Sequence, residues 1–188
     1  MQDTTRANGV RQTIAGEDVR FASRIFLTAL LVAFVPSAWA QNSANVTGAT
    51  IDWFGVYGSE ETEIKDPNVS TGQHYTSSNI VPPTTNSDEI ILTPATRFGF
   101  GFTLTGEGSG NVVLTQIYKY PSPGMPRGNS GRYVSTDKLP FTYAFGSGNV
   151  MGYNVGSDPS GWPAGTWTFQ LWSGDRLLIE KIFTVAHR

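Results

Sequence analysis

The sequence predicts an all-β protein, an antiparallel β-sandwich of about seven or eight strands. Three observations lead to this prediction. Apolar residues alternate with polar or small residues along much of the chain after residue 40, and no segment there shows the periodicity of a helix. Gly and Pro, which favour turns, are frequent, with 21 and 11 residues. A barrel is the alternative, because the number of strands does not settle whether a sheet closes.

An apolar run near the N-terminus predicts a signal peptide. The run extends from Ile25 to Val35, follows Arg20 and Arg24, and precedes Pro36. A membrane-spanning helix needs about 20 apolar residues, so this run is too short to be an anchor. A cationic flank, a short apolar stretch and a helix-breaking residue are instead typical of a signal peptide.

The predicted signal peptide covers residues 1–40 and is cleaved after Ala40, because Ala38-Trp39-Ala40 has the small-x-small pattern of a cleavage site. Residues 1–18 are polar and longer than a signal peptide requires, and we interpret them as an extension upstream of a start near Val19. We expect general secretory export and a periplasmic or secreted protein. Residues 41–188 are then a single β-sandwich domain.

The strongest alternation lies in the strand expected from Arg97 to Thr105. Large apolar side chains occupy every second position and share one face, whereas Gly and Thr occupy the other face. The inner residues of this strand are Phe98, Phe100, Phe102 and Leu104. Further strands are expected at Thr50–Tyr57, Glu89–Leu92, Val112–Tyr120, Phe141–Phe145 and Met151–Val155.

The C-terminal residues predict a β-hairpin. Trp167, Phe169 and Leu171 alternate on one face of its first strand, and Ser173–Arg176 has turn-forming residues. The second strand runs to Val185 and is expected to place four residues on the same inner face: Leu177, Ile179, Phe183 and Val185.

A long polar segment from Asp66 to Asp88 interrupts the predicted strands. It is rich in Ser, Thr, Asn and Pro, and we expect a loop within the domain, with an edge strand around His74-Tyr75 as the alternative. An acidic cluster lies at its start and consists of Glu60, Glu61, Glu63 and Asp66. Their spacing does not match an EF-hand, so a charged loop, or a strand edge that discourages edge-to-edge pairing, explains them better than a calcium site.

Composition excludes several functions. Cysteine is absent, which excludes disulfides, thiolate metal sites and cysteine nucleophiles. The net charge of −2 gives no basic excess for binding nucleic acid. Both histidines, His74 and His187, are expected to be solvated at the surface, and no nucleophile elbow is present. We therefore expect no enzymatic activity, no cofactor and no bound metal.

Four aromatic residues are the candidates for contacts with a ligand or partner. Trp172 follows Leu171 and so points away from the inner face, and Trp162 lies in a loop. Tyr118 and Tyr120 lie two residues apart at the end of an expected strand, so their side chains share one face. Exposed aromatic rings can stack on sugars or anchor protein interfaces. The alternative is that these side chains cover the edges and ends of the sandwich.

Several motifs, in their order along the chain, resemble a known family. They are Trp53–Gly58 (WFGVYG), Thr96–Phe100 (TRFGF), Pro121–Gly124 (PSPG), Pro163–Phe169 (PAGTWTF) and Glu180–Val185 (EKIFTV). From about Gly48 to Val185, the chain resembles a family of exported bacterial proteins that share a domain of unknown function. The resemblance implies a single immunoglobulin-like sandwich in the bacterial envelope, and it carries over no catalytic residue.

These observations together predict an exported, non-enzymatic, immunoglobulin-like module that binds another component of the cell envelope, either a protein or a glycan. The alternative is a carbohydrate-binding domain that uses its exposed aromatic residues, with Trp162 and Trp172 foremost. No nucleic-acid partner is expected, and no stable membrane insertion after cleavage.

Overall fold

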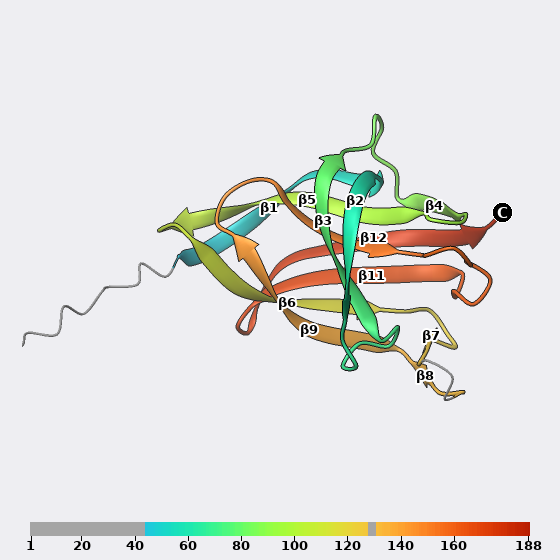
Figure 1. Ribbon diagram of the computed structural model, residues 1–188. Coiled ribbons are helices and arrows are strands. Elements are labelled where there is room, and N and C mark those ends of the chain that lie inside the picture. The colour runs from blue at the N-terminus through green and yellow to red at the C-terminus, as the bar shows by residue number, and fades with distance from the viewer. Residues whose placement is uncertain (1–43, 128–130) are drawn as a thin grey trace, which may run out of the picture. The chain divides into compact units, whose positions relative to one another are not determined.

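A three-stranded sheet and a five-stranded sheet make up the sandwich in the computed structural model, which describes residues 44–127 and 131–188 (Figure 1). The smaller sheet has the order β1 (Asn45–Val56), β5 (Arg97–Glu107), β10 (Asn149–Asn154). The larger sheet has the order β4 (Glu89–Leu92), β12 (Arg176–His187), β11 (Gly165–Ser173), β6 (Asn111–Lys119), β9 (Thr136–Ala144). All neighbours are antiparallel except β4 and β12. The predicted sandwich is therefore confirmed, and the predicted signal peptide lies outside the described residues.

The order of the strands is that of an immunoglobulin-like sandwich. In that fold, strands A, B, E and D form one sheet and strands C, F and G form the other, with C′ beside C in the variable type. Here β1, β5 and β10 correspond to A, B and E, and β12, β11, β6 and β9 correspond to G, F, C and C′. None of the described strands takes the place of D, so β10 is an edge strand of its sheet.

Two short hairpins accompany the sandwich. One joins β2 (Gly58–Lys65) to β3 (Gln73–Val81), and the other joins β7 (Met125–Pro126) to β8 (Tyr133–Val134). Figure 1 shows β2 and β3 running across the direction of the sandwich strands. The prediction of a loop throughout Asp66–Asp88 is therefore wrong over β3, where the alternative of a strand around His74-Tyr75 is confirmed. No helix among the described residues is long and apolar enough to cross a membrane.

Aromatic side chains from both sheets fill the core. On β5, the four side chains predicted to face inward are buried, and they alternate with small residues as expected: Phe98, Phe100, Phe102 and Leu104. The ring of Phe98 packs 5.6 Å from Trp167 and 5.5 Å from Phe183 across the sandwich. Leu177 was expected on the inner face but is 40% exposed, next to a register shift between β11 and β12.

Glycine at position 99 lets β10 lie close to β5. A Cβ atom at Gly99 would lie 2.2 Å from the carbonyl oxygen of Met151 and 2.5 Å from the Cα atom of Gly152. Because both obstacles are backbone atoms, Gly99→Ala must push β10 away, and we expect a loss of about 1–3 kcal/mol in the free energy of unfolding. Gly161→Ala is the control, because a Cβ atom there meets nothing within 4 Å. Equal denaturant midpoints for the two variants would contradict this packing.

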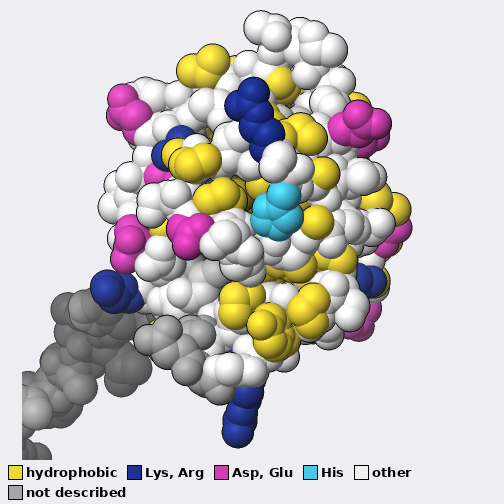
Figure 2. Space-filling model, turned by 90° about the vertical axis from the view of Figure 1, so that its right-hand side faces the viewer, with side chains coloured by type: hydrophobic (Ala, Val, Ile, Leu, Met, Phe, Trp, Pro, Cys, Tyr) yellow, Lys and Arg dark blue, Asp and Glu magenta, His cyan; other side chains and the backbone are white. Residues whose placement is uncertain are grey.

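Loops that carry aromatic and proline residues lie at the end of the sandwich where β12 finishes. Figure 2 looks onto the right-hand side of Figure 1 and shows apolar side chains across this face, with acidic side chains mostly at its margins. The loop between β10 and β11 reaches this end, because the carbonyl oxygen of Trp162 lies 2.8 Å from Nε2 of His187. The predicted loop position of Trp162 is thereby confirmed.

Candidate functional site

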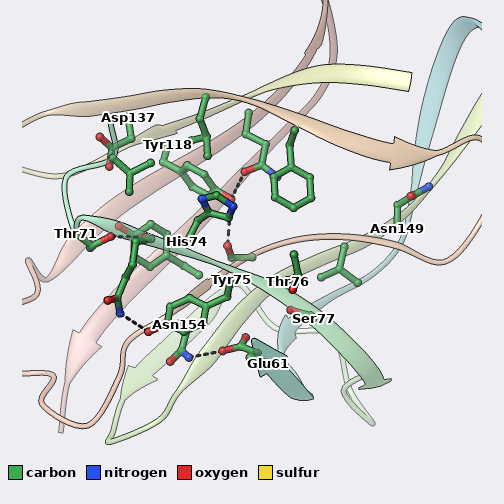
Figure 3. A pocket seen from close by; sticks show the side chains of 18 of the residues that line it. Glu61, Thr71, His74, Tyr75, Thr76, Ser77, Tyr118, Asp137, Asn149 and Asn154 are labelled. Atoms are coloured by element: carbon green, nitrogen blue, oxygen red, sulfur yellow. Dashed lines mark hydrogen bonds between the residues drawn. The ribbon is translucent and has the colours of Figure 1, made fainter. Parts of the chain in front are cut away.

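A cavity of about 310 Å³ lies where the β2–β3 hairpin passes over the edge strands β9 and β10 (Figure 3). Its lining comes from the hairpin, from β6 and β9 of the larger sheet, and from β10 of the smaller sheet. The volume is at the lower end of the range of about 300–1,000 Å³ that is typical of small-molecule sites. This position between the sheets corresponds to the side of the sandwich at which strand D is missing.

Six of the seven tyrosines of the chain line this cavity, which we call the tyrosine cavity: Tyr57, Tyr75, Tyr118, Tyr120, Tyr143 and Tyr153. The alternation of the strands places them there. On β6, Tyr118 shares the inward face of Leu114 and Gln116, and on β9, Tyr143 shares the inward face of Asp137 and Leu139. Because both strands alternate in this way, polar side chains collect at one side of an otherwise apolar core.

Gln116 connects two of these tyrosines. The hydroxyl oxygen of Tyr118 lies 2.8 Å from Oε1 of Gln116 and 3.1 Å from the carbonyl oxygen of Gly152 on β10. The side-chain amide of Gln116 donates to the hydroxyl of Tyr143. The network therefore joins β6, β9 and β10 and fixes two hydroxyl groups at the wall of the cavity.

Asp137 organises a second network, at the tip of the hairpin. Its Oδ2 atom accepts hydrogen bonds from the Ser70 hydroxyl and, at 2.7 Å, from the Tyr120 hydroxyl, and the backbone N–H of Ser70 donates to Oδ1 at 3.1 Å. The hydroxyl oxygens of Tyr120 and Tyr153 lie 3.1 Å apart. Asp137 is buried, and several donors are what a buried carboxylate requires. Ser70 thereby ties the turn between β2 and β3 to β9.

Glu61 ties the other part of the hairpin to the smaller sheet. Its Oε2 atom lies 3.1 Å from Nε of Arg97 on β5 and accepts a hydrogen bond from the side-chain amide of Asn154 on β10. The Glu61 side chain is only 5% exposed. One of the residues in the predicted acidic cluster is therefore a buried structural anchor. Among the described residues, no group of three or more His, Asp or Glu side chains is arranged to hold a metal ion.

His74 lies on β3, and the prediction that it is a solvated loop residue is wrong. Its side chain is 27% exposed, its ring packs edge-on to Phe141 at 6.0 Å, and Nδ1 lies 3.5 Å from Oδ2 of Asp66. The backbone N–H of Asn68 lowers the pKa of Asp66, and His74 adds to this effect. The Asp66 carboxylate is therefore ionised at neutral pH and faces the His74 ring. The His74 ring lies at the cavity wall (Figure 3).

Burial raises the pKa of the tyrosines of the cavity. For Tyr118 and Tyr143, desolvation of the phenolate is the main cause, and the pKa of Tyr120 is raised further by Tyr153 and Asp137. These hydroxyl groups stay protonated at neutral pH and can both donate and accept hydrogen bonds.

The cavity has no Lys or Arg side chain to receive an anion. Glu61 and Asp137 are among its lining residues, and its one basic side chain within the described part of the chain is His74, whose Nδ1 already faces Asp66. Burying an anionic ligand beside the two carboxylates would cost free energy that no Lys or Arg of the lining compensates. The arrangement is therefore suited to an uncharged ligand with several hydroxyl or amide groups.

The structure brings together three of the four residues that the sequence analysis singled out. Tyr118, Tyr120 and Trp162 line the tyrosine cavity. The expectation that the two tyrosines are exposed is wrong, because Tyr118 is 6% and Tyr120 is 7% exposed. Trp172 lies outside the cavity, on the outer face of the larger sheet, where its Nε1–H donates to Gln170 at 3.2 Å.

Trp162 is half-buried rather than fully exposed. Its indole stacks on Trp167 with 6.2 Å between the centroids and 13° between the planes, and it meets the ring of Tyr153 edge-on at 5.0 Å. These contacts fix the orientation of the indole at the cavity wall. A fixed aromatic ring costs little conformational entropy when a ligand binds to it.

Sequence reasoning missed several residues of the site. The sequence pattern indicates Tyr57 and Tyr153 only as strand residues and predicts a loop over Gln73–Ser77, yet all of these residues line the cavity. The parity of β6 was a usable signal for Tyr118, because every second residue from Val112 onward faces inward.

Comparison with solved structures adds a similarity in fold. An immunoglobulin-like protein from Pseudomonas aeruginosa aligns with 78% of this chain and 99% of its own, at 23% sequence identity and a TM-score of 0.46. No protein-family model and no curated protein matches the chain. The assignment of an immunoglobulin-like fold therefore rests on the order of the strands described above.

Proposed function

We propose that this protein is an exported, non-enzymatic immunoglobulin-like module that binds another component of the bacterial cell envelope, and that this component is an uncharged glycan. Its export and its place in the family of exported bacterial proteins are supported by the signal-peptide pattern before Gln41 and by the ordered motifs of the sandwich. The glycan is supported by the chemistry of the tyrosine cavity.

One observation supports the choice of a glycan as the ligand. Six tyrosines, each of which carries a hydroxyl group, line one cavity of about 310 Å³ whose described lining includes no Lys or Arg: Tyr57, Tyr75, Tyr118, Tyr120, Tyr143 and Tyr153. Sugars offer hydroxyl groups that donate and accept, and they offer apolar ring faces that pack on aromatic side chains. The half-buried ring of Trp162 supplies an aromatic wall next to these hydroxyl groups.

A binding screen with matched variants tests the proposal. The exported protein is titrated with glucose, galactose, mannose and N-acetylglucosamine, with their short oligomers, and with glucuronate as the anionic comparison. We expect at least one neutral sugar to bind and glucuronate to bind more weakly. Tyr118→Phe and Tyr153→Phe each remove one hydroxyl group, so each should weaken binding of that sugar about 5–10-fold. Tyr133→Phe is the control, because Tyr133 is 57% exposed and lies outside the cavity.

Two results would overturn the proposal. The first is a folded protein that binds none of these sugars. The second is a sugar whose affinity is the same for the two cavity variants and for Tyr133→Phe, because that sugar would then bind elsewhere. Trp162→Ala is expected to weaken binding as the tyrosine variants do, whereas Trp172→Ala is expected to leave it unchanged.

A further inference from the structure

We propose that the binding site is a groove with a second subsite at Trp53, and that its ligand is therefore an oligosaccharide chain rather than a single sugar. This inference rests on the proposed function. It adds a residue, Trp53, that lies outside the tyrosine cavity, and it narrows the class of ligand to a linear glycan.

A second hollow adjoins the tyrosine cavity. It measures about 210 Å³. Its lining consists of Asp52 and Trp53 of β1, Ile80 of β3, Pro82 just after β3, and Gly148, Asn149 and Val150 at the start of β10. Four residues line both spaces: Ile80, Gly148, Asn149 and Val150. Because the two spaces share this wall, a ligand that fills the tyrosine cavity can continue past β10 toward Trp53.

A β-bulge places the indole of Trp53 in this position. Ile51 pairs with Phe102, and the next paired residue of β1 is Trp53, which pairs with Gly101, so Asp52 is the extra residue. Without the bulge, Trp53 would have the parity of Ile51 and would point toward the side of Phe102, into the sandwich. The bulge turns Trp53 to the outer face of the smaller sheet instead. Bulges often redirect a side chain in this way next to functional sites.

The indole of Trp53 lies flat against a glycine. A Cβ atom at Gly101 would lie 2.2 Å from Nε1 of Trp53, so the ring occupies the space that any larger residue would fill. The ring is also 5.4 Å from that of Tyr57, which lines the tyrosine cavity. One side of the indole is thus supported by β5, and the half-buried side chain leaves an aromatic surface beside the second hollow. A supported aromatic ring is a platform on which a sugar ring can stack.

Comparing a monosaccharide with its oligomers tests the second subsite. The probes are the neutral sugar that binds in the screen above and its linear oligomers, titrated into the exported protein. We expect the oligomers to bind more tightly than the monosaccharide. Trp53→Ala should weaken binding of the oligomers about 3–10-fold and change binding of the monosaccharide less than about 2-fold, whereas Tyr118→Phe should weaken both alike.

Gly101→Ala provides a second variant that retains the tryptophan. Its new Cβ atom must displace the indole, so it should reproduce the effect of Trp53→Ala on the oligomers, and Trp172→Ala should change neither affinity. Equal affinities for monosaccharide and oligomers would overturn the second subsite and leave the proposed function standing. The second subsite would also be overturned if Trp53→Ala and Gly101→Ala each weakened the binding of the monosaccharide as much as the binding of the oligomers. Absence of binding by any sugar would overturn both proposals.

Discussion

Replacing Trp167 with Ala is expected to lower the free energy of unfolding by about 3–5 kcal/mol, as removal of a large buried aromatic side chain does. The Trp167 side chain is fully buried and packs against rings of both sheets, at 5.6 Å from Phe98 and 4.9 Å from Tyr120. Its Nε1–H also donates to the carbonyl oxygen of Pro163 at 2.9 Å. The variant therefore loses apolar contacts and leaves a partly buried acceptor without its donor.

Urea unfolding of the wild type and of two tryptophan variants measures this effect. Trp172→Ala is the matched control. Because Trp172 is half-buried on the outer face of the same strand, its replacement should lower the free energy of unfolding less than Trp167→Ala does. Trp167→Ala should also weaken sugar binding, because Trp162 stacks on this residue. A midpoint for Trp167→Ala equal to that of the wild type would show that the inner face of β11 has been assigned wrongly.

Alkaline pH is expected to unfold the protein cooperatively above about pH 10, where tyrosine ionises in an unfolded chain. Burial raises the pKa of Tyr57, Tyr118, Tyr120 and Tyr143 in the folded protein. A group with a raised folded pKa contributes its full stability below the unfolded pKa and loses it as the pH rises above that value. Each tyrosine that folding keeps protonated then lowers the free energy of unfolding by about 1.4 kcal/mol per pH unit, so four tyrosines lower it by about 5.6 kcal/mol over one unit.

A spectroscopic titration follows this transition. Tyrosinate absorbance and circular dichroism are recorded together as the pH is raised. We expect the absorbance of these four tyrosines to appear only as the β-sheet signal is lost, between about pH 11 and 12 for a protein of ordinary stability. In urea, where the chain is unfolded, the same residues should titrate near pH 10. Ionisation of all the tyrosines near pH 10 with the fold retained would contradict the burial of the tyrosine cavity.

The sandwich could be predicted from the sequence because its core strands carry a strong period of two. On β5, Phe98, Phe100 and Phe102 alternate with small residues, and a strand with one buried face must show this pattern. The same reasoning identified the inner face of β11. It also placed Trp172 on the outer face, where the structure has it.

The sequence offered a strand around His74-Tyr75 only as an alternative, and the pairing of β2 with β3 could not be predicted, because these strands carry almost no apolar alternation. Residues Gly58–Lys65 are mostly polar, and most of them remain exposed. The two strands pair with each other, and the hairpin is held over the sandwich by a few polar contacts of Glu61 and Ser70. Those contacts join residues far apart in the chain, so no local pattern shows them.

The candidate site was only partly predictable for the same reason. Tyr118 and Tyr120 were selected as aromatic residues, but their burial depends on β10 and on the hairpin that cover them. Trp53 was not selected, because a bulge of one residue at Asp52 decides which face it occupies. A shift of one residue in register moves every following side chain of the strand to the opposite face of the sheet, and no local sequence pattern shows where such a shift occurs.

The most direct test of the glycan site is an NMR titration of the isotope-labelled protein with the neutral sugar that binds best in the screen. We predict that shifts of the backbone amide signals concentrate in Gln73–Ser77 of β3, in β9 and in β10, around the tyrosine cavity. With an oligomer, they should extend to Trp53. Shifts confined to the outer face around Trp172, or no shifts at all, would contradict the account.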